Sequence, residues 1–171
     1  MPDFDPDRQR DANLLMATVR EAGALALRLY GPELKQWTKG GSSPVSDADI
    51  AVDELIRLRL QSVTPDYGWL SEESVDDRSR LSRAKTWIID PIDGTRAYLG
   101  ARKDWSVSAA LVAEGKPIIG AVFAPATDEF FFAVRGGGVT RNGEAIAATS
   151  GAALDVTRMA GPRFMIDRLR D

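Results

Sequence analysis

The chain has 171 residues, a formal net charge of −3 at pH 7 and 44% hydrophobic residues. These values are typical of one globular domain or a large piece of a bigger protein, and they exclude a disordered or fibrous chain. The sequence contains no Cys and no His, which excludes disulfides, thiolate zinc sites and His-dependent nucleophile triads within these residues. Chemistry carried by this chain must therefore rest on carboxylates, hydroxyls, lysine or a bound metal.

The charge balance and the apolar runs also limit the expected partners. A slightly acidic chain is unsuited to nucleic acid, which normally needs a clustered basic face. The first ten residues are acidic and broken by proline, without the basic and then apolar pattern of a signal peptide, and no apolar run approaches a membrane span. We therefore expect a cytoplasmic protein without a membrane or nucleic-acid partner, for which a small phosphorylated ligand remains open.

Two helices are predicted in the first part of the chain. Residues 11–30 carry apolar side chains at a helical period, and a Gly-Pro pair ends the segment. The polar, glycine- and serine-rich residues 38–44 are predicted to form a mobile loop. A second helix is expected over residues 47–63, with Ser46 as N-cap and Asp49 three residues later, which is the spacing of a capping box.

The following residues alternate apolar segments with turn signals. Residues 67–71 form a short apolar segment that leads into an acidic pair, and residues 86–89 predict a buried strand that runs directly into Asp90. Both strands thus end in carboxylates. Three further strands are expected, joined by hairpin-length connections, and Asn142-Gly143 predicts one more hairpin. The predicted strands and hairpin span residues 105–113, 118–124, 130–134 and 139–146.

These elements predict an α/β layered sandwich in which two helices pack on a mostly antiparallel sheet. Residues 1–150 are expected to form one domain. Residues 151–171 show no clear element and are interpreted as the start of a connection to a second domain.

The motif with the clearest chemistry is DPIDGT, residues 90–95. Pro91 keeps Asp90 extended and fixes its own φ, so the strand ends in one defined shape from which Asp93 can turn toward the same point. The carbonyl of Ile92 offers a third oxygen, and clustered hard oxygens suit Mg²⁺ or Mn²⁺. Gly94 permits close backbone approach, and Thr95 can begin a short helix whose free N–H groups would face an anion.

Each of these residues also has a purely structural interpretation. An Asp-Pro turn followed by a helix cap accounts for any one residue of the motif, and Asp49 could serve only the capping box. Glu72, in the pair Glu72-Glu73, could be a solvated surface residue. Lys39 could contact phosphate but is more typical of a flexible surface lysine. The glycine run at residues 136–138 is interpreted as part of a strand and hairpin, because Asn142-Gly143 follows it.

Three motifs together resemble the inositol monophosphatase superfamily of Mg²⁺-dependent, lithium-sensitive phosphatases. They are DPIDGT at residues 90–95, LSEE at residues 70–73 and SPVSDAD at residues 43–49, and they occur in the order and at the spacing expected of the family. The resemblance implies a sugar-phosphatase-like fold whose N-terminal domain binds metal and phosphate. It extends from the first helix to the Asn142-Gly143 hairpin.

The resemblance implies a role for each motif residue. Glu72, Asp90 and the carbonyl of Ile92 would bind a first metal ion, and Asp90 and Asp93 would contribute to a second. Thr95, hydrogen-bonded to Asp49, would help Glu72 to orient and deprotonate the attacking water. Asp93, Gly94 and Thr95 would contact the substrate phosphate. Mg²⁺ is the implied cofactor, Mn²⁺ a substitute, and Li⁺ and Ca²⁺ are implied inhibitors.

The resemblance also suggests a substrate class, and the sequence departs from the family pattern in one respect. The SPVS-x-AD segment and the residues after DPIDGT are most similar to the bacterial 3′(2′),5′-bisphosphate nucleotidase branch, with inositol monophosphate the next candidate and fructose bisphosphate a distant third. The family pattern continues past this sequence, with a Trp-Asp pair that completes the second metal site. No Trp-Asp pair occurs here. Two hypotheses therefore stand: the chain is a phosphomonoesterase, or it is a catalytically inactive module that only binds a metal or a partner. The resemblance also implies a possible homodimer, which is usual in the family.

Overall fold

A computed structural model of the chain describes residues 6–31, 36–39, 43–148 and 150. The N-terminal part holds helices α1 and α2 and a small strand pair. The first five elements are α1 (Pro6–Leu29), β1 (Gln36–Lys39), β2 (Ser43–Ser46), α2 (Asp47–Val63) and β3 (Gly68–Ser71). The remaining elements are a 3-10 turn (Ser79–Ser82), β4 (Lys85–Asp93), α3 (Thr95–Leu99), β5 (Ser106–Ala113), β6 (Lys116–Ala124), β7 (Glu129–Val134), β8 (Gly138–Arg141) and β9 (Glu144–Ile146).

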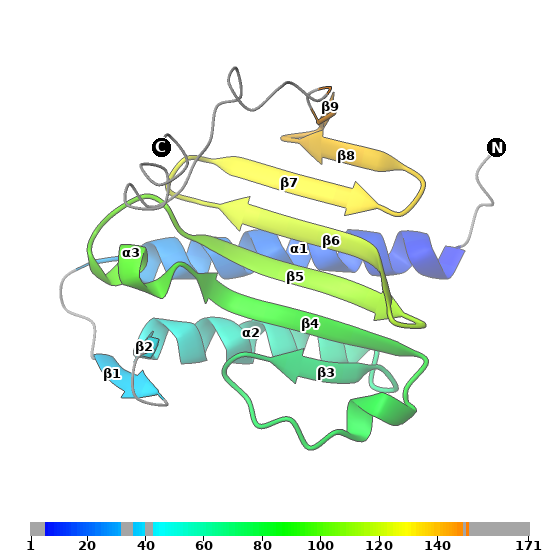
Figure 1. The fold of residues 1–171 in the computed structure, drawn as a ribbon, viewed down its shortest axis with the longest axis horizontal. Coiled ribbons are helices and arrows are strands. Elements are labelled where there is room, and N and C mark those ends of the chain that lie inside the picture. The colour runs from blue at the N-terminus through cyan, green and yellow to red at the C-terminus, as the bar shows by residue number, and fades with distance from the viewer. Residues whose placement is uncertain (1–5, 32–35, 40–42, 149, 151–171) are drawn as a thin grey trace, which may run out of the picture.

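Strands β3 to β9 form one seven-stranded sheet in sequence order (Figure 1). β3 pairs parallel with β4, and every later neighbour pairs antiparallel. The predicted antiparallel meander is therefore confirmed. The parallel pair is the part that matters for the site, because it brings the C-terminal ends of β3 and β4 to the same edge region.

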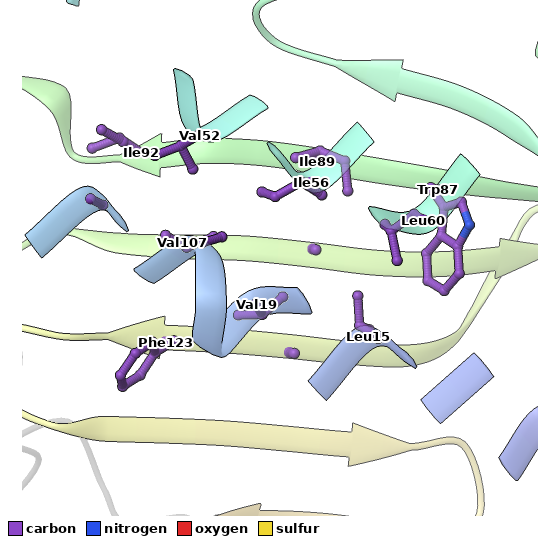
Figure 2. Packing of buried hydrophobic residues seen from close by; sticks show 14 of the residues in the cluster. Leu15, Val19, Val52, Ile56, Leu60, Trp87, Ile89, Ile92, Val107 and Phe123 are labelled. Atoms are coloured by element: carbon purple, nitrogen blue, oxygen red, sulfur yellow. The ribbon is translucent and has the colours of Figure 1, made fainter. Parts of the chain in front are cut away.

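Helices α1 and α2 lie side by side on one face of this sheet (Figure 1). α1 buries residues at helical spacing, including Leu15, Val19 and Ala22, and α2 buries Val52 and Ile56 in the same way. Figure 2 shows Leu15, Val19, Val52 and Ile56 against inward-facing residues of the central strands, among them Trp87, Ile89 and Val107. The predicted α/β class, with two helices on a mostly antiparallel sheet, is confirmed.

The observed helix boundaries agree with the prediction for α2 and differ from it at the start of α1. α2 spans the predicted residues 47–63. α1 begins at Pro6, five residues before the predicted start at residue 11. The periodic pattern of apolar residues did not reveal this first part of the helix, because the buried face begins only at Asp11 and Ala12. Proline is favourable in the first helical turn, where its missing N–H has no helical partner to lose.

The predicted mobile loop over residues 38–44 is wrong at both ends. Residues 36–39 and 43–46 form the antiparallel strands β1 and β2, paired from Gln36 with Ser46 to Lys39 with Ser43. Residues 40–42 lie outside the described residues. A two-stranded ribbon this short has no hydrophobic alternation of its own, so its polar composition indicated a loop.

The two turn signals near the end of the sheet behave as expected. Asn142 and Gly143 both have positive φ, 51° and 86°, as a two-residue hairpin turn requires. Gly136 and Gly137 lie in the turn between β7 and β8, where the N–H of Gly137 donates to the carbonyl of Val134 at 2.8 Å, and Gly138 begins β8. Residues 151–171 lie outside the described residues. Within the described part, no helix combines the length and the apolar character needed to cross a membrane.

Candidate active site

The parallel pairing of β3 and β4 places two acidic residues side by side. Ser71 is the register partner of Ile89, so the next residue on each strand, Glu72 and Asp90, follows at the same edge of the sheet. The N–H of Glu72 continues the ladder by donating to the carbonyl of Ile89 at 3.3 Å. The sequence predicted that both strands end in carboxylates, and the structure shows that these ends are neighbours.

The end of β4 is bent at its proline. Asp90 still pairs with Ser108, but the register shifts before Asp93 pairs with Ser106. Pro91 lies in this irregular stretch and cannot donate to the ladder. Ile92 is 2% exposed, and Figure 2 shows its side chain beside Val52 of α2. The corner is thus anchored by an apolar contact, while Asp93 beyond it is exposed.

Gly94 makes the connection from β4 to α3 possible. Its φ is +86°, and a Cβ at this position would lie 2.8 Å from the carbonyl oxygen of Asp104. Its own carbonyl accepts the N–H groups of Ala97 and Tyr98, at 2.8 and 3.0 Å, which starts α3. Only glycine fits both the left-handed conformation and this close backbone approach.

A hydrogen-bonded chain connects α2 to the start of α3. The hydroxyl of Thr95 lies 3.2 Å from Oδ1 of Asp49 and 3.0 Å from the carbonyl oxygen of Ile92. Oδ2 of Asp49 accepts the backbone N–H of Ser46 at 2.8 Å and its hydroxyl at 2.5 Å. Asp49, 2% exposed, therefore serves the capping box with one oxygen and faces Thr95 with the other, so the two interpretations of this residue are compatible.

Asp90 lies in a field of like charges. Burial, followed by the charges of Glu72 and Asp93, raises the pKa of Asp90 from 3.8 to about 7. Asp49 and Glu73 act in the same direction with smaller effects. The acidic residues that the sequence singled out thus gather around Asp90. A nearby cation would reverse the sign of this effect and favour the ionised carboxylate.

The donors fit a hard divalent cation in kind. Carboxylates and a backbone carbonyl are the oxygen ligands that Mg²⁺ and Mn²⁺ prefer, and a concentration of negative charge is what a cation relieves. Among the residues that the structure describes, however, no three acidic side chains stand ready in an arrangement that could hold a metal ion. Glu72 and Asp93 are exposed at this edge, so their side chains would have to turn inward for a cation to be held.

One residue that contacts the site, Asp53, was not found from the sequence. Asp53, on α2, accepts a short hydrogen bond from the hydroxyl of Ser71 at the end of β3. The available signal was an acidic residue on the apolar face of a helix, between Val52 and Ile56, both fully buried. The side chain of Lys39 lies outside the described residues, and its phosphate-contact interpretation stays untested.

The chain is similar to known phosphatases over most of its length. Residues 7–161 match the inositol monophosphatase family. The chain is 36% identical over 132 residues to an inositol-1-monophosphatase of Rhizobium meliloti, covering 76% of this chain and 49% of that protein. It is 33% identical over 121 residues to the 3′(2′),5′-bisphosphate nucleotidase CysQ of Salmonella typhimurium, covering 69% of this chain and 49% of that protein.

The fold shows the same relationship. The solved structure of a Thermotoga maritima inositol monophosphatase (IMPase) superposes with a TM-score of 0.76 at 28% identity, covering 83% of this chain and 55% of that one. The present chain thus spans about half the length of the relatives it matches. The motifs at residues 43–49, 70–73 and 90–95 all lie within the matched range. The chain belongs to the inositol monophosphatase family.

Proposed function

We propose that this chain forms the metal- and phosphate-binding part of a Mg²⁺-dependent phosphomonoesterase that acts on a small phosphorylated metabolite. The observation that carries the proposal is the meeting of three separate segments at one edge of the sheet. Glu72 follows β3, Asp90 ends the regular part of β4, and Asp49 reaches Thr95 from α2. Family membership gives the reaction class, and a related IMPase/NADP phosphatase solved in complex with Mg²⁺ and phosphate supports the choice of cofactor.

Four residues would hold the cation: Glu72, Asp90, Asp93 and, through its backbone carbonyl, Ile92. A divalent ion bound among such oxygens supplies Lewis-acid stabilisation of a phosphoryl group and lowers the pKa of a coordinated water. Mn²⁺ is expected to substitute for Mg²⁺, and Li⁺ and Ca²⁺ are expected to inhibit.

The hydroxyl of Thr95 has a geometry suited to orienting a water molecule. Asp49 and the carbonyl of Ile92 are both acceptors, so the hydroxyl proton points toward them. The lone pairs of the Thr95 oxygen are then directed away from Asp49 and can accept a hydrogen bond from a water molecule. In this proposal Glu72 accepts one proton from the water as the water oxygen bonds to phosphorus, the ester P–O bond breaks and the alcohol leaves, taking a proton from solvent. The step needs no histidine.

The start of α3 would bind the substrate phosphate. Gly94 is the N-cap of this short helix and Thr95 its first residue, where backbone N–H groups lack partners within the helix and favour an anion. Asp93 lies next to this position and would contact the phosphate through the shared cation. The domain that carries these groups would comprise residues 1–150, and residues 151–171 would begin the connection to a second domain.

The proposed substrate is a 3′(2′),5′-bisphosphate nucleotide or inositol monophosphate. Both substrate classes occur among the relatives' names, and the two identities, 36% and 33%, are too close to separate them. A cytoplasmic location and a homodimer are further proposals that rest on the family resemblance. Nucleic acid and membrane are not expected partners.

The experiment is a phosphate-release assay with Mg²⁺ across these substrates, using the wild-type chain and Asp90→Asn. The proposal predicts Mg²⁺-dependent release that Asp90→Asn abolishes while the circular dichroism spectrum stays unchanged. Release that is equal in both proteins, or independent of metal, would contradict it.

A second candidate function is a non-catalytic module that only binds a divalent ion or a partner. One observation favours it: the acidic side chains that the structure describes do not form a ready metal site. This candidate predicts weak Mn²⁺ binding that Asp90→Asn abolishes, without turnover of any substrate. Calorimetry combined with the phosphate-release assay separates the two candidates.

A further inference from the structure

A buried carboxylate on α2 contacts the end of the strand that carries Glu72. Asp53 follows Asp49 by four residues, so both side chains lie on the same face of the helix, toward the sheet. Asp53 is 6% exposed and Ser71, the last residue of β3, is 5% exposed. Oδ1 of Asp53 accepts the hydroxyl proton of Ser71 in a short hydrogen bond.

Ser71 passes this contact on to the backbone around Glu72. Its hydroxyl oxygen accepts the N–H of Glu73 at 3.2 Å, while the N–H of Glu72 itself donates to β4, at the carbonyl of Ile89, at 3.3 Å. The peptide units on both sides of the Glu72 side chain are therefore held by different elements. One is held from α2 through Ser71 and the other by the neighbouring strand.

Placing a carboxylate in this position is costly for folding. Burial of an ionised group costs several kcal/mol unless hydrogen bonds compensate, and apolar residues of similar volume often hold two elements together equally well. Val52 and Ile56 already make such apolar contacts between α2 and the sheet (Figure 2). A polar connection at this point therefore does something that apolar packing cannot do: it fixes the orientation of a peptide through directional hydrogen bonds.

We propose that Asp53 and Ser71 form a positioning pair that orients the backbone at Glu72, so that the carboxylate of Glu72 can turn toward Asp90 and share a divalent cation with it. This inference rests on the proposed function. Asp53 and Ser71 act through Glu72 and are not themselves ligands. Hydrogen-bonded supports of this kind typically change metal affinity by about 10- to 100-fold when they are removed.

The test measures Mn²⁺ affinity by isothermal titration calorimetry on the full chain, together with urea unfolding of each variant. Asp53→Ala and Ser71→Ala are expected to weaken Mn²⁺ binding by about 10-fold or more. Asp53→Asn keeps an oxygen acceptor of the same shape and is expected to recover most of the affinity. Ser62→Ala is the control, because Ser62 is an exposed serine of α2 whose hydroxyl donates to the carbonyl of Arg59 in its own helix.

A double-mutant cycle separates positioning from simple stabilisation. If the two residues act as one unit, the Asp53→Ala/Ser71→Ala double variant loses no more Mn²⁺ affinity than the weaker-binding single variant, within about a factor of two. If the double variant instead loses Mn²⁺ affinity by the product of the two single losses, the two residues act independently and the positioning pair is refuted. If Asp53→Ala proves too unstable to titrate, Asp53→Leu takes its place in the comparison, because an apolar residue of similar volume fills the site without accepting a hydrogen bond.

The outcomes also distinguish this inference from the proposed function. If the wild type binds Mn²⁺, Asp90→Asn does not, and Asp53→Ala binds as tightly as the wild type, then the positioning pair is refuted while the metal site stands. A loss of unfolding free energy in Asp53→Ala without any change in Mn²⁺ affinity refutes the pair in the same way. If the wild type does not bind Mn²⁺, the proposed site fails and the positioning pair fails with it.

Discussion

Replacing Gly94 with alanine measures how much the connection into α3 depends on close backbone approach. The φ of +86° at this position disfavours an L side chain by about 1–2 kcal/mol. The new Cβ would also lie 2.8 Å from the carbonyl oxygen of Asp104 and 3.3 Å from the Cα of Trp105. Both are backbone atoms, which cannot rotate away, so the overlap should cost a further ~1–3 kcal/mol.

Gly115 provides the matched control for this prediction. It lies in the turn between β5 and β6 with a φ of +70°, but a Cβ there would meet nothing within 4 Å. Gly115→Ala should therefore lose only the conformational part, about 1–2 kcal/mol. The two substitutions differ in the backbone contact and share the strained φ.

The assay is equilibrium urea unfolding followed by tryptophan fluorescence, for which Trp105, 3% exposed and next to the site, is a suitable probe. Gly94→Ala is expected to lower the free energy of unfolding by about 2–5 kcal/mol in total, clearly more than Gly115→Ala. Equal losses in the two variants, within about 0.5 kcal/mol, would show that the close approach of Gly94 to residues 104–105 contributes nothing.

Three further predictions concern catalysis, pH and the core. Thr95→Ala should lower turnover by about 100-fold or more while Thr95→Ser keeps most of it; equal activity of both variants in phosphate release would argue against a role for the hydroxyl. The pKa of the buried Asp11 is lowered, because its three hydrogen-bond donors outweigh the opposing effect of burial, so its stabilisation is complete above the unfolded pKa of about 3.9 and disappears as the pH falls through the folded value. Urea unfolding between pH 6 and pH 3 should show a smaller acid-induced loss in Asp11→Asn than in the wild type, and parallel curves would refute this. Leu15→Ala, at a fully buried position, should cost ~2–5 kcal/mol, whereas Leu58→Ala, 69% exposed, should cost about 0.5 kcal/mol or less; similar losses would contradict the packing in Figure 2.

Local signals predicted most of the fold. The bounds of α2 could be read from its capping residues and from Pro65, because a helix start and a proline stop depend only on neighbouring residues. The Asn142-Gly143 turn was equally local. Strands β1 and β2 were missed because each is short and polar, and their pairing depends on contacts that sequence patterns do not record.

The candidate site was only partly visible in the sequence. The motif at residues 90–95 indicated which oxygens could gather, and the family resemblance implied the hydrogen bond of Thr95 to Asp49, 46 residues earlier in the chain, which the structure shows. Other contacts had no such signal. The contact between Asp53 and Ser71 spans 18 residues, and the hydrogen bond from Lys85 to the buried Asp11 spans 74. Such contacts follow from the packing of α1 and α2 on the sheet, which becomes known only once the strand order is fixed.

In the proposed site, the ends of β3 and β4 hold a divalent cation beside the start of α3. The most direct measurement is anomalous diffraction from crystals soaked in Mn²⁺ and inorganic phosphate. We expect an anomalous peak in contact with the carboxylates of Glu72 and Asp90 and with the carbonyl of Ile92, and phosphate density at the N–H groups of Gly94 and Thr95. Well-ordered carboxylates with no peak among them, or a peak elsewhere on the chain, would contradict the claim.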